Sequence, residues 1–245
     1  MVTLRETMLS KQHIGSSRYD SEIKDLARVL DIKQFYESCR GFDTTTLNFQ
    51  PLKNNAFSDE VLDAITTNKF TIVVKERQIG FSTIEAVIAL YYTQMLGKCV
   101  SVIGNGNMMS RIKTIYVMLP DHLKFGIKKL TKKCIKFNNG TFIRSEEKHV
   151  SYSPDLIMYD EYDFLPSRRF REFISKIAPS ISARVGDQLL IGSTLGTKKT
   201  EGSLTDLLTN SVYGVYNFQT LDLTKIEILK KQFDRNNKIN NILDI

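Results

Sequence analysis

The stretch FTIVVKERQIGFST, from Phe70 to Thr83, decides how this sequence folds. Its first part, 70–74, is an apolar run typical of a buried strand, and it leads through a loop into a helix-like segment. The loop contains Gly80, which lets the backbone approach an anion closely, and the free N–H groups at the start of the helix would point at that anion. The pattern therefore indicates a phosphate-binding loop.

The loop departs from the usual G-x-x-x-x-G-K-[ST] pattern at two positions. The first glycine position holds Lys75 and the usual lysine position holds Phe81, whereas Gly80 and the following hydroxyl residue are in place. A lysine at the front of the loop can reach the same anion, because the loop wraps the phosphates and both of its ends flank them. We therefore expect Lys75 to grip phosphates, with Ser82 as the Mg²⁺ ligand and Thr83 as the alternative.

A second motif, LIMYDEYDF from Leu156 to Phe164, supports the first. The loop alone is a weak signal, because an ordinary strand, turn and helix can give the same pattern. Here an apolar run ends in two acids, as in a buried parallel strand whose carboxyl end opens on a cleft. We expect Asp160 to hold Mg²⁺ through water and Glu161 to activate the attacking water as a general base. An acidic turn after a core strand is the simpler alternative.

The sequence resembles the ATPase domain of the large terminase subunit, the DNA-packaging motor of tailed bacteriophages. The resemblance runs from about Val61 to Leu208. It is carried by KERQIGFST (75–83), MLPDHLKFGI (118–127), FNNGTFI (137–143), LIMYDEYDF (156–164) and IGSTLG (191–196). A lysine at the front of the phosphate loop is a known variant of that family, and Lys75 with Phe81 matches it.

The resemblance implies ATP and Mg²⁺ as ligands and assigns roles to particular residues. The nucleotide-binding residues would be Lys75, Glu76, Arg77, Gln78, Ile79, Gly80, Phe81, Ser82 and Thr83, with Ser82 and Asp160 on the metal and Glu161 and Arg77 catalytic. Arg77 falls on the loop arginine implicated in triggering hydrolysis, where it would offset charge on the γ-phosphate. Ser193 and Thr194 fall on the coupling motif that senses the γ-phosphate. The adenine-contacting glutamine of the family has no match, since Ser58 lies nearest and Gln50 is displaced.

The resemblance also implies the partners and the place of action. The chain would hydrolyse ATP to move double-stranded DNA into a procapsid. It would act as a homo-oligomeric ring on the portal protein, with the small terminase subunit as a further partner, and it could be a monomer in solution. Its place would be the host cell cytoplasm, and it would be absent from the mature virion.

Composition agrees with these expectations without proving them. The 245 residues are 42% hydrophobic and 25% charged, which suits one large α/β domain with a small attachment. A net charge of +7 and a pI near 9.2 fit a polyanionic partner such as DNA. No apolar run approaches the roughly 18 residues that a membrane span needs. The three cysteines are widely separated, so we expect reduced thiols in a cytosolic protein and no zinc site.

We predict an α/β fold of the P-loop (ASCE, RecA-like) class, in which a parallel sheet carries helices on both faces and a small N-terminal helical lid subdomain is attached. The expected parts are an N-terminal helical or lid segment (1–56), the P-loop ATPase core (57–220) and a C-terminal helix or linker (221–245) toward an absent nuclease domain. Strands are predicted at 70–74, 99–103, 134–137, 156–159, 189–191 and 212–218. Helices are predicted at 21–38, 83–96, 107–119, 168–177, 204–208 and 225–233, and a polar linker or lid edge at 41–55.

Three other functions are compatible with parts of the sequence. A metal-dependent nuclease could be built on Asp155, Asp160, Glu161 and Asp163. A non-hydrolysing DNA-binding or scaffolding module could keep a degenerate loop, and Phe81 is the best support for it. A helicase is the nearest enzymatic alternative, but the sequence contains a single core of this kind.

Several further features have weaker functional interpretations. The segment 104–109 resembles a dinucleotide-binding loop but lacks its third glycine. The lysines between 124 and 136 are more often a solvated surface than a DNA-binding one. Arg168, Arg169 and Arg171 follow the acidic pair and are candidates for sensing nucleotide or reaching a neighbouring subunit.

Overall fold

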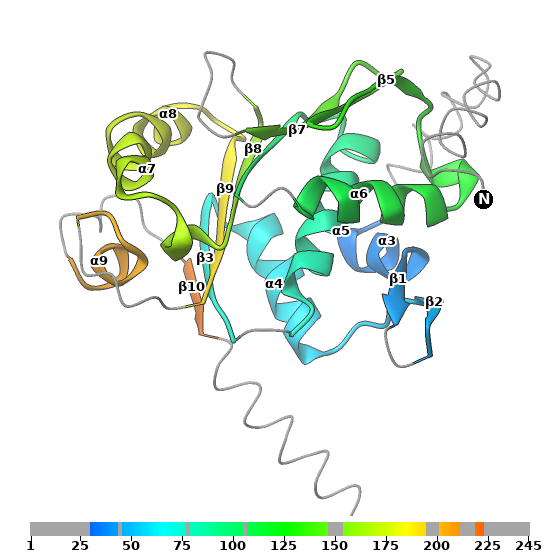
Figure 1. Ribbon diagram of the computed structural model, residues 1–245, viewed down its shortest axis with the longest axis horizontal. Coiled ribbons are helices and arrows are strands. Elements are labelled where there is room, and N and C mark those ends of the chain that lie inside the picture. Colours follow the sequence, from blue (N-terminus) through cyan, green and yellow to red (C-terminus); the bar gives the residue numbers. More distant parts are fainter. Residues whose placement is uncertain are drawn as a thin grey trace, which may run out of the picture.

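The fold was analysed in a computed structural model (Figure 1). It describes residues 30–43, 46–76, 79–104, 107–146, 154–194, 201–210 and 219–222. Within these residues the centre is an eight-stranded sheet in the order β10-β3-β9-β8-β4-β7-β6-β5. Its strands are β3 (Phe70–Val74), β4 (Val100–Ile103), β5 (Ile127–Leu130), β6 (Cys134–Phe137), β7 (Phe142–Glu146), β8 (Leu156–Asp160), β9 (Gln188–Ser193) and β10 (Gln219–Asp222). Neighbours from β10 to β7 are parallel, and β7, β6 and β5 pair antiparallel.

Helices cover both faces of this sheet, as predicted. One face carries α3 (Ile32–Ser38), α4 (Ala56–Thr67), α5 (Phe81–Gln94) and α6 (Asn107–Met118). The other carries α7 (Ser167–Glu172), the π-helical η4 (Phe173–Ile177), α8 (Ala178–Ala183) and α9 (Leu204–Thr209), and Figure 1 shows the two groups on opposite sides of β3, β8 and β9. Right-handed crossovers explain this division. The connection from β3 to β4 runs along the sheet in one direction and the connection from β8 to β9 runs in the other, so their helices lie on opposite faces. No helix in the described ranges is long and apolar enough to cross a membrane.

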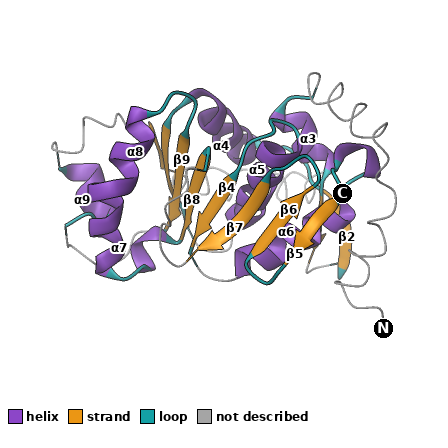
Figure 2. Cartoon of the chain, turned by 90° about the horizontal axis from the view of Figure 1, so that it is seen from above, coloured by secondary structure: helices purple, strands orange, loops and turns teal. Residues whose placement is uncertain are grey.

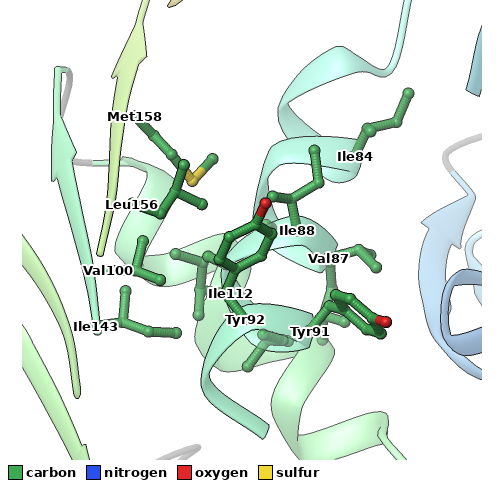
Figure 3. Close-up of a cluster of buried hydrophobic side chains, with 14 of the residues drawn as sticks. Ile84, Val87, Ile88, Tyr91, Tyr92, Val100, Ile112, Ile143, Leu156 and Met158 are labelled. Atoms are coloured by element: carbon green, nitrogen blue, oxygen red, sulfur yellow. The ribbon is translucent and has the colours of Figure 1, made fainter. Parts of the chain in front are cut away.

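The helix that follows the phosphate loop, α5, forms the centre of one core. It packs against the sheet, α3, α4 and α6, so it is apolar on nearly every side. Figure 3 shows Ile84, Ile88 and Tyr92 of this helix beside apolar side chains from the sheet strands and from α6. Tyr91 and Tyr92 are both buried, and the Tyr92 hydroxyl donates to the Ile65 carbonyl at 3.3 Å. Burial of this helix on all sides fixes the position of the loop in front of it.

The N-terminal part contains a hairpin that the sequence did not reveal. β1 (Arg40–Asp43) and β2 (Asn48–Pro51) pair antiparallel where a polar linker was predicted over 41–55. Phe42 lies opposite Phe49, and their rings meet edge to face with centroids 5.3 Å apart. A cross-strand aromatic pair of this kind stabilises a short hairpin. The preceding helix α3 packs onto α5, so this segment continues the core.

The far edge of the sheet adds antiparallel strands to the predicted parallel sheet. β6 was predicted, but it pairs antiparallel with β5 and β7, two strands that were not predicted. Figure 2 shows β5, β6 and β7 side by side at that end. In β6, Ile135 is buried and Lys136 is exposed, which is the alternation of a strand with one wet face. The predicted strand 212–218, helix 225–233 and the first part of helix 21–38 lie outside the described residues.

Candidate active site

The carboxyl ends of three neighbouring strands meet at one edge of the sheet. β9 lies between β3 and β8, with Val74 paired to Ser193 and Asp160 paired to Gly192. In open α/β sheets, ligands bind outside the carboxyl ends of the strands. The residues that follow these ends are therefore placed side by side, although they are far apart in the sequence.

Lys75, Glu161 and Thr194 meet at this edge. The Lys75 ammonium donates to Glu161 Oε1 at 2.5 Å, and the lysine is only 5% exposed. The Thr194 hydroxyl and its N–H group point at Glu161 Oε2, at 3.3 and 3.4 Å. These three residues, which were named from separate motifs, thus form one group.

Glu161 has a backbone conformation that the sequence did not indicate. Its φ of 53° and ψ of 51° are left-handed, which is uncommon for a residue that is not glycine. Sparsely populated backbone conformations cost free energy and cluster at functional sites. The turn places the carboxylate toward Lys75, and the short helix η3 (Tyr162–Phe164) follows directly.

The start of α5 is arranged to receive an anion. Gly80, the N-cap, has a left-handed φ of 84°, and no side chain caps the helix. The first turn also contains no acid, so its free N–H groups and the positive end of the helix dipole are available to a phosphate. Ser82 and Thr83 are half-buried in this turn. Arg77 and Gln78, which were predicted to bind nucleotide, lie outside the described residues.

Phe81 has a definite place in this site. Its ring is buried, and the Lys75 ammonium lies 5.6 Å from the ring centroid. The ring also rests on Gly192 of β9, because a Cβ added there would lie 2.1 Å from Phe81 Cε1. The aromatic ring thus fills the usual lysine position and forms part of the wall beside Lys75.

Asp160 has an acidic neighbour, Glu85, that the sequence analysis missed. Glu85 is completely buried on α5, and a Cβ added to Gly192 would lie 2.9 Å from its Oε1. Burial, and then the charge of Asp160, raise the pKa of Glu85 well above its usual value. Burial and the charge of Glu161 likewise raise the pKa of Asp160, partly offset by Lys75. An acid four residues after Phe81, within an otherwise apolar helix, was the available signal.

A second glycine explains the loop that resembled a dinucleotide fingerprint. Gly104, just after β4, has a φ of 157°, and a Cβ added to it would lie 2.6 Å from the Asp160 carbonyl oxygen. The glycine is therefore required for close approach of the β4 end to Asp160.

The two residues of the coupling motif extend the site toward α9. The buried Ser193 hydroxyl accepts from the Asp163 N–H at 3.1 Å and donates to the Thr194 carbonyl at 2.8 Å. Asp163 Oδ1 in turn accepts from the N–H of Leu204, the first residue of α9, at 2.8 Å. A chain of hydrogen bonds thus joins the turn after β8, the end of β9 and α9.

One of the four acids suggested for a nuclease lies apart from the other three. Asp155 lies at the opposite end of β8 from Asp160, where its carboxylate accepts from the Cys99 N–H at 2.7 Å. A strand of this length separates its ends by about 16 Å. Across the described ranges, no group of three or more His, Cys, Asp or Glu side chains is arranged to hold a metal.

The residues nearest the expected adenine contact have other roles or positions. Ser58 is buried and forms a reciprocal cap with Asn55 at the start of α4, with hydrogen bonds of 2.9 Å in both directions. Gln50 is exposed on β2. A cavity of about 420 Å³ opens beside Thr83 and is lined in part by Arg40, Phe42 and Arg111. Arg111 donates to the Thr83 hydroxyl at 3.1 Å, so a basic surface adjoins the loop.

Comparisons with known proteins identify the fold. No protein-family model and no curated protein matches the sequence. The structure is similar to the large terminase of bacteriophage HK97, with a TM-score of 0.60 at 16% identity over 78% of this chain and 43% of that chain. Looser likenesses are the large terminase ATPase domain of Thermus phage P74-26 (TM-score 0.44, 16% identity, 60% of this chain and 67% of that one) and the large terminase of the thermophilic phage D6E with ATP-γ-S (TM-score 0.46, 13% identity, 64% and 40%). The chain spans less than half the length of the HK97 protein, and the likeness confirms the predicted α/β fold with helices on both faces of the sheet.

Proposed function

We propose that this chain is an Mg²⁺-dependent ATPase and the motor domain of a viral DNA-packaging machine. The observation that carries the proposal is the meeting of Lys75, Glu161 and Thr194 at the carboxyl edge of a sheet whose fold is that of the HK97 large terminase. In this function the chain moves double-stranded DNA into a procapsid. It works as a ring on the portal protein, with the small terminase subunit, in the host cell cytoplasm.

The residues of the site suit the binding of a triphosphate with its metal. Lys75 and the N–H groups at the start of α5 hold the phosphates. Ser82 and Asp160 would hold Mg²⁺, and Asp160 fits because, apart from the neighbouring Glu85 carboxyl group, no donor among the described residues reaches its buried Oδ1. The bound cation neutralises charge on the phosphate oxygens. Arg77 offsets the charge that develops on the γ-phosphate.

The ion pair of Lys75 and Glu161 suggests how the general base is released. The Lys75 ammonium lies 2.5 Å from Glu161 Oε1. An incoming phosphate competes for the same ammonium, because a charge-assisted hydrogen bond to phosphate is at least as favourable as one to a carboxylate. Glu161 is then free to orient and deprotonate the attacking water. Thr194, bonded to the same carboxylate, reports this change through Ser193 toward α9.

Replacing Glu161 with Ala tests the proposal. The variant should bind ATP nearly as well as the wild type, while phosphate release falls by about 10²- to 10⁴-fold, the usual contribution of a general base. Turnover equal to that of the wild type would refute the assignment. A scaffolding module would bind no labelled ATP at all.

Two further assays test whether the chain acts on DNA as a motor or as a nuclease. Linear duplex DNA should stimulate phosphate release, with an effect that weakens as salt rises, because contacts to phosphates release counterions. Exposed Lys128, Lys129 and Lys136 on β5 and β6 are candidates for such contacts. In the second assay the chain should not nick a plasmid in the presence of Mn²⁺. Nicking by this chain on its own would favour the nuclease alternative.

A further inference from the structure

One buried acid beside the site has no part in the reaction described above. Glu85 lies on the side of α5 that faces β9 and has no exposed surface. Carboxylates are seldom fully buried without a cation or a hydrogen-bond donor, because burying a charge costs free energy. Its surroundings therefore indicate what it binds.

The carboxyl groups of Glu85 and Asp160 adjoin each other. Apart from one another, no donor in the described ranges reaches Glu85 Oε1, Glu85 Oε2 or Asp160 Oδ1. The buried cation of the site, Lys75, is bonded to Glu161. Arg111, whose charge also acts on Asp160, donates to Thr83. Two buried carboxyl groups thus meet without a cation of their own among the described residues.

The backbone is shaped to bring the two groups together. Gly192 pairs with Asp160 across β9 and β8, and a side chain there would collide with both Phe81 and Glu85. Gly104 gives the same close approach on the other side of Asp160. The glycine at position 192 thus leaves room for the Glu85 carboxyl group, one turn of α5 after Ser82, and the glycine at position 104 leaves room for Asp160 itself.

We propose that Glu85 is a second carboxylate of the divalent-cation site, shared with Asp160, and that the pair binds a cation before nucleotide arrives. Carboxylate oxygens are the ligands that Mg²⁺ and Mn²⁺ prefer, and a cation offsets both charges at once. The proposal rests on the proposed function for the identity of the site. It goes beyond that function because cation binding then does not need the phosphates of ATP.

The direct test measures Mn²⁺ binding to the whole chain without nucleotide. Electron paramagnetic resonance counts free Mn²⁺, and Glu85→Gln keeps the shape while it removes the charge. The affinity for Mn²⁺ should fall by about 10- to 100-fold, the usual effect of losing a supporting group at a metal site. Glu60→Gln, at an exposed position of α4, is the matched control and should leave the affinity unchanged. Equal affinity in Glu85→Gln and the wild type would overturn the proposal.

Thermal unfolding is a second measurement, and it distinguishes a metal-binding role of Glu85 from a purely structural one. Mn²⁺ should raise the Tm of the wild type and of Glu60→Gln, and the shift should vanish in Glu85→Gln and in Asp160→Asn. Without metal and near neutral pH, Glu85→Gln should unfold at or above the wild-type temperature, because the amide needs no proton uptake on folding, whereas the buried Glu85 carboxyl group does. If instead it unfolds earlier and still responds to Mn²⁺, Glu85 only supports Asp160 by a shared proton, and the proposal fails.

ATP binding to the wild type separates this inference from the proposed function. A wild-type chain that binds Mn²⁺ through Glu85 but binds no ATP would refute the ATPase and keep the cation site. A chain that binds ATP, with the same Mn²⁺ affinity in wild type and Glu85→Gln, would keep the ATPase and refute the cation site.

Discussion

The two acids at the end of β8 lie in different environments. Glu161, in the turn after the strand, is partly exposed and has a cation and a threonine as partners. Asp160, the last residue of the strand, is buried against another acid, Glu85, and its Oδ1 has no donor in the described ranges. The Glu161 carboxylate has its partners within the protein and can exchange them, whereas the Glu85 and Asp160 pair has no cation of its own in the described ranges. We call these two environments the Glu161 side and the Asp160 side. In the proposed function these two environments suit Glu161 to water activation and Asp160 to metal binding.

Removal of the Lys75 ammonium should have the largest effect on the Glu161 side. Lys75→Ala loses a charge-assisted hydrogen bond to phosphate of about 2–3 kcal/mol, which is roughly 30- to 150-fold in Kd for ATP. Isothermal titration calorimetry measures this directly. Lys98→Ala, at the other end of α5, is the control and should bind ATP as the wild type does. Unchanged affinity in Lys75→Ala would place phosphate binding elsewhere.

A side chain added at Gly192 of β9 should disturb both the Glu161 side and the Asp160 side. In Gly192→Ala the new methyl group meets the Phe81 ring and the Glu85 carboxylate, so overpacking should cost about 1–3 kcal/mol of unfolding free energy. Phe81→Leu in the same chain should recover part of the loss, because the two positions touch. Urea unfolding measures the effect. In Gly126→Ala, the methyl group meets only the mobile end of Asn138, so the cost should be smaller.

The Asp160 side should give the metal-free chain a characteristic pH dependence. The pKa of Glu85 and that of Asp160 are raised in the folded state, so the folded chain holds protons that the unfolded chain releases. Stability is therefore lost as pH rises above the ordinary carboxyl range, by up to about 1.4 kcal/mol per pH unit for each proton. Measured with a chelator, the wild type should lose stability relative to Glu85→Gln as the pH rises above about 5, just beyond the ordinary carboxyl range. A constant difference would contradict the raised pKa of Glu85.

A substitution far from both the Glu161 side and the Asp160 side should have the smallest effect on ATP binding and stability. Ser58→Ala removes the hydroxyl half of the reciprocal cap at the start of α4, while the bond from the Ser58 N–H to Asn55 remains, and should lower the unfolding free energy by about 1 kcal/mol, the net value of one hydrogen bond. ATP affinity should stay within error of the wild type, since the hydroxyl is committed to Asn55. A large loss of ATP binding would show that Ser58 contacts the nucleotide after all.

The sequence predicted the elements whose pattern is local. β3, the loop and α5 were readable because a buried strand, a left-handed glycine and an apolar helix follow one another within 25 residues, 70–94. The antiparallel strands β5 and β7 were not predicted, because short strands with one wet face carry a weak pattern. The turn at 138–140 between β6 and β7 contains an Asn-Gly pair, and that was the usable signal.

The sequence alone determined which chemistry can occur at the site: a lysine in front of the loop, a glycine at the helix start and two adjacent acids after an apolar strand. These depend on residue type and on contacts within a few positions. The tertiary structure alone decided that Lys75 pairs with Glu161, that Phe81 rests on Gly192 and that Glu85 lies against Asp160. Such contacts join residues about 75 to 110 positions apart, and strand order sets them, which no local pattern specifies.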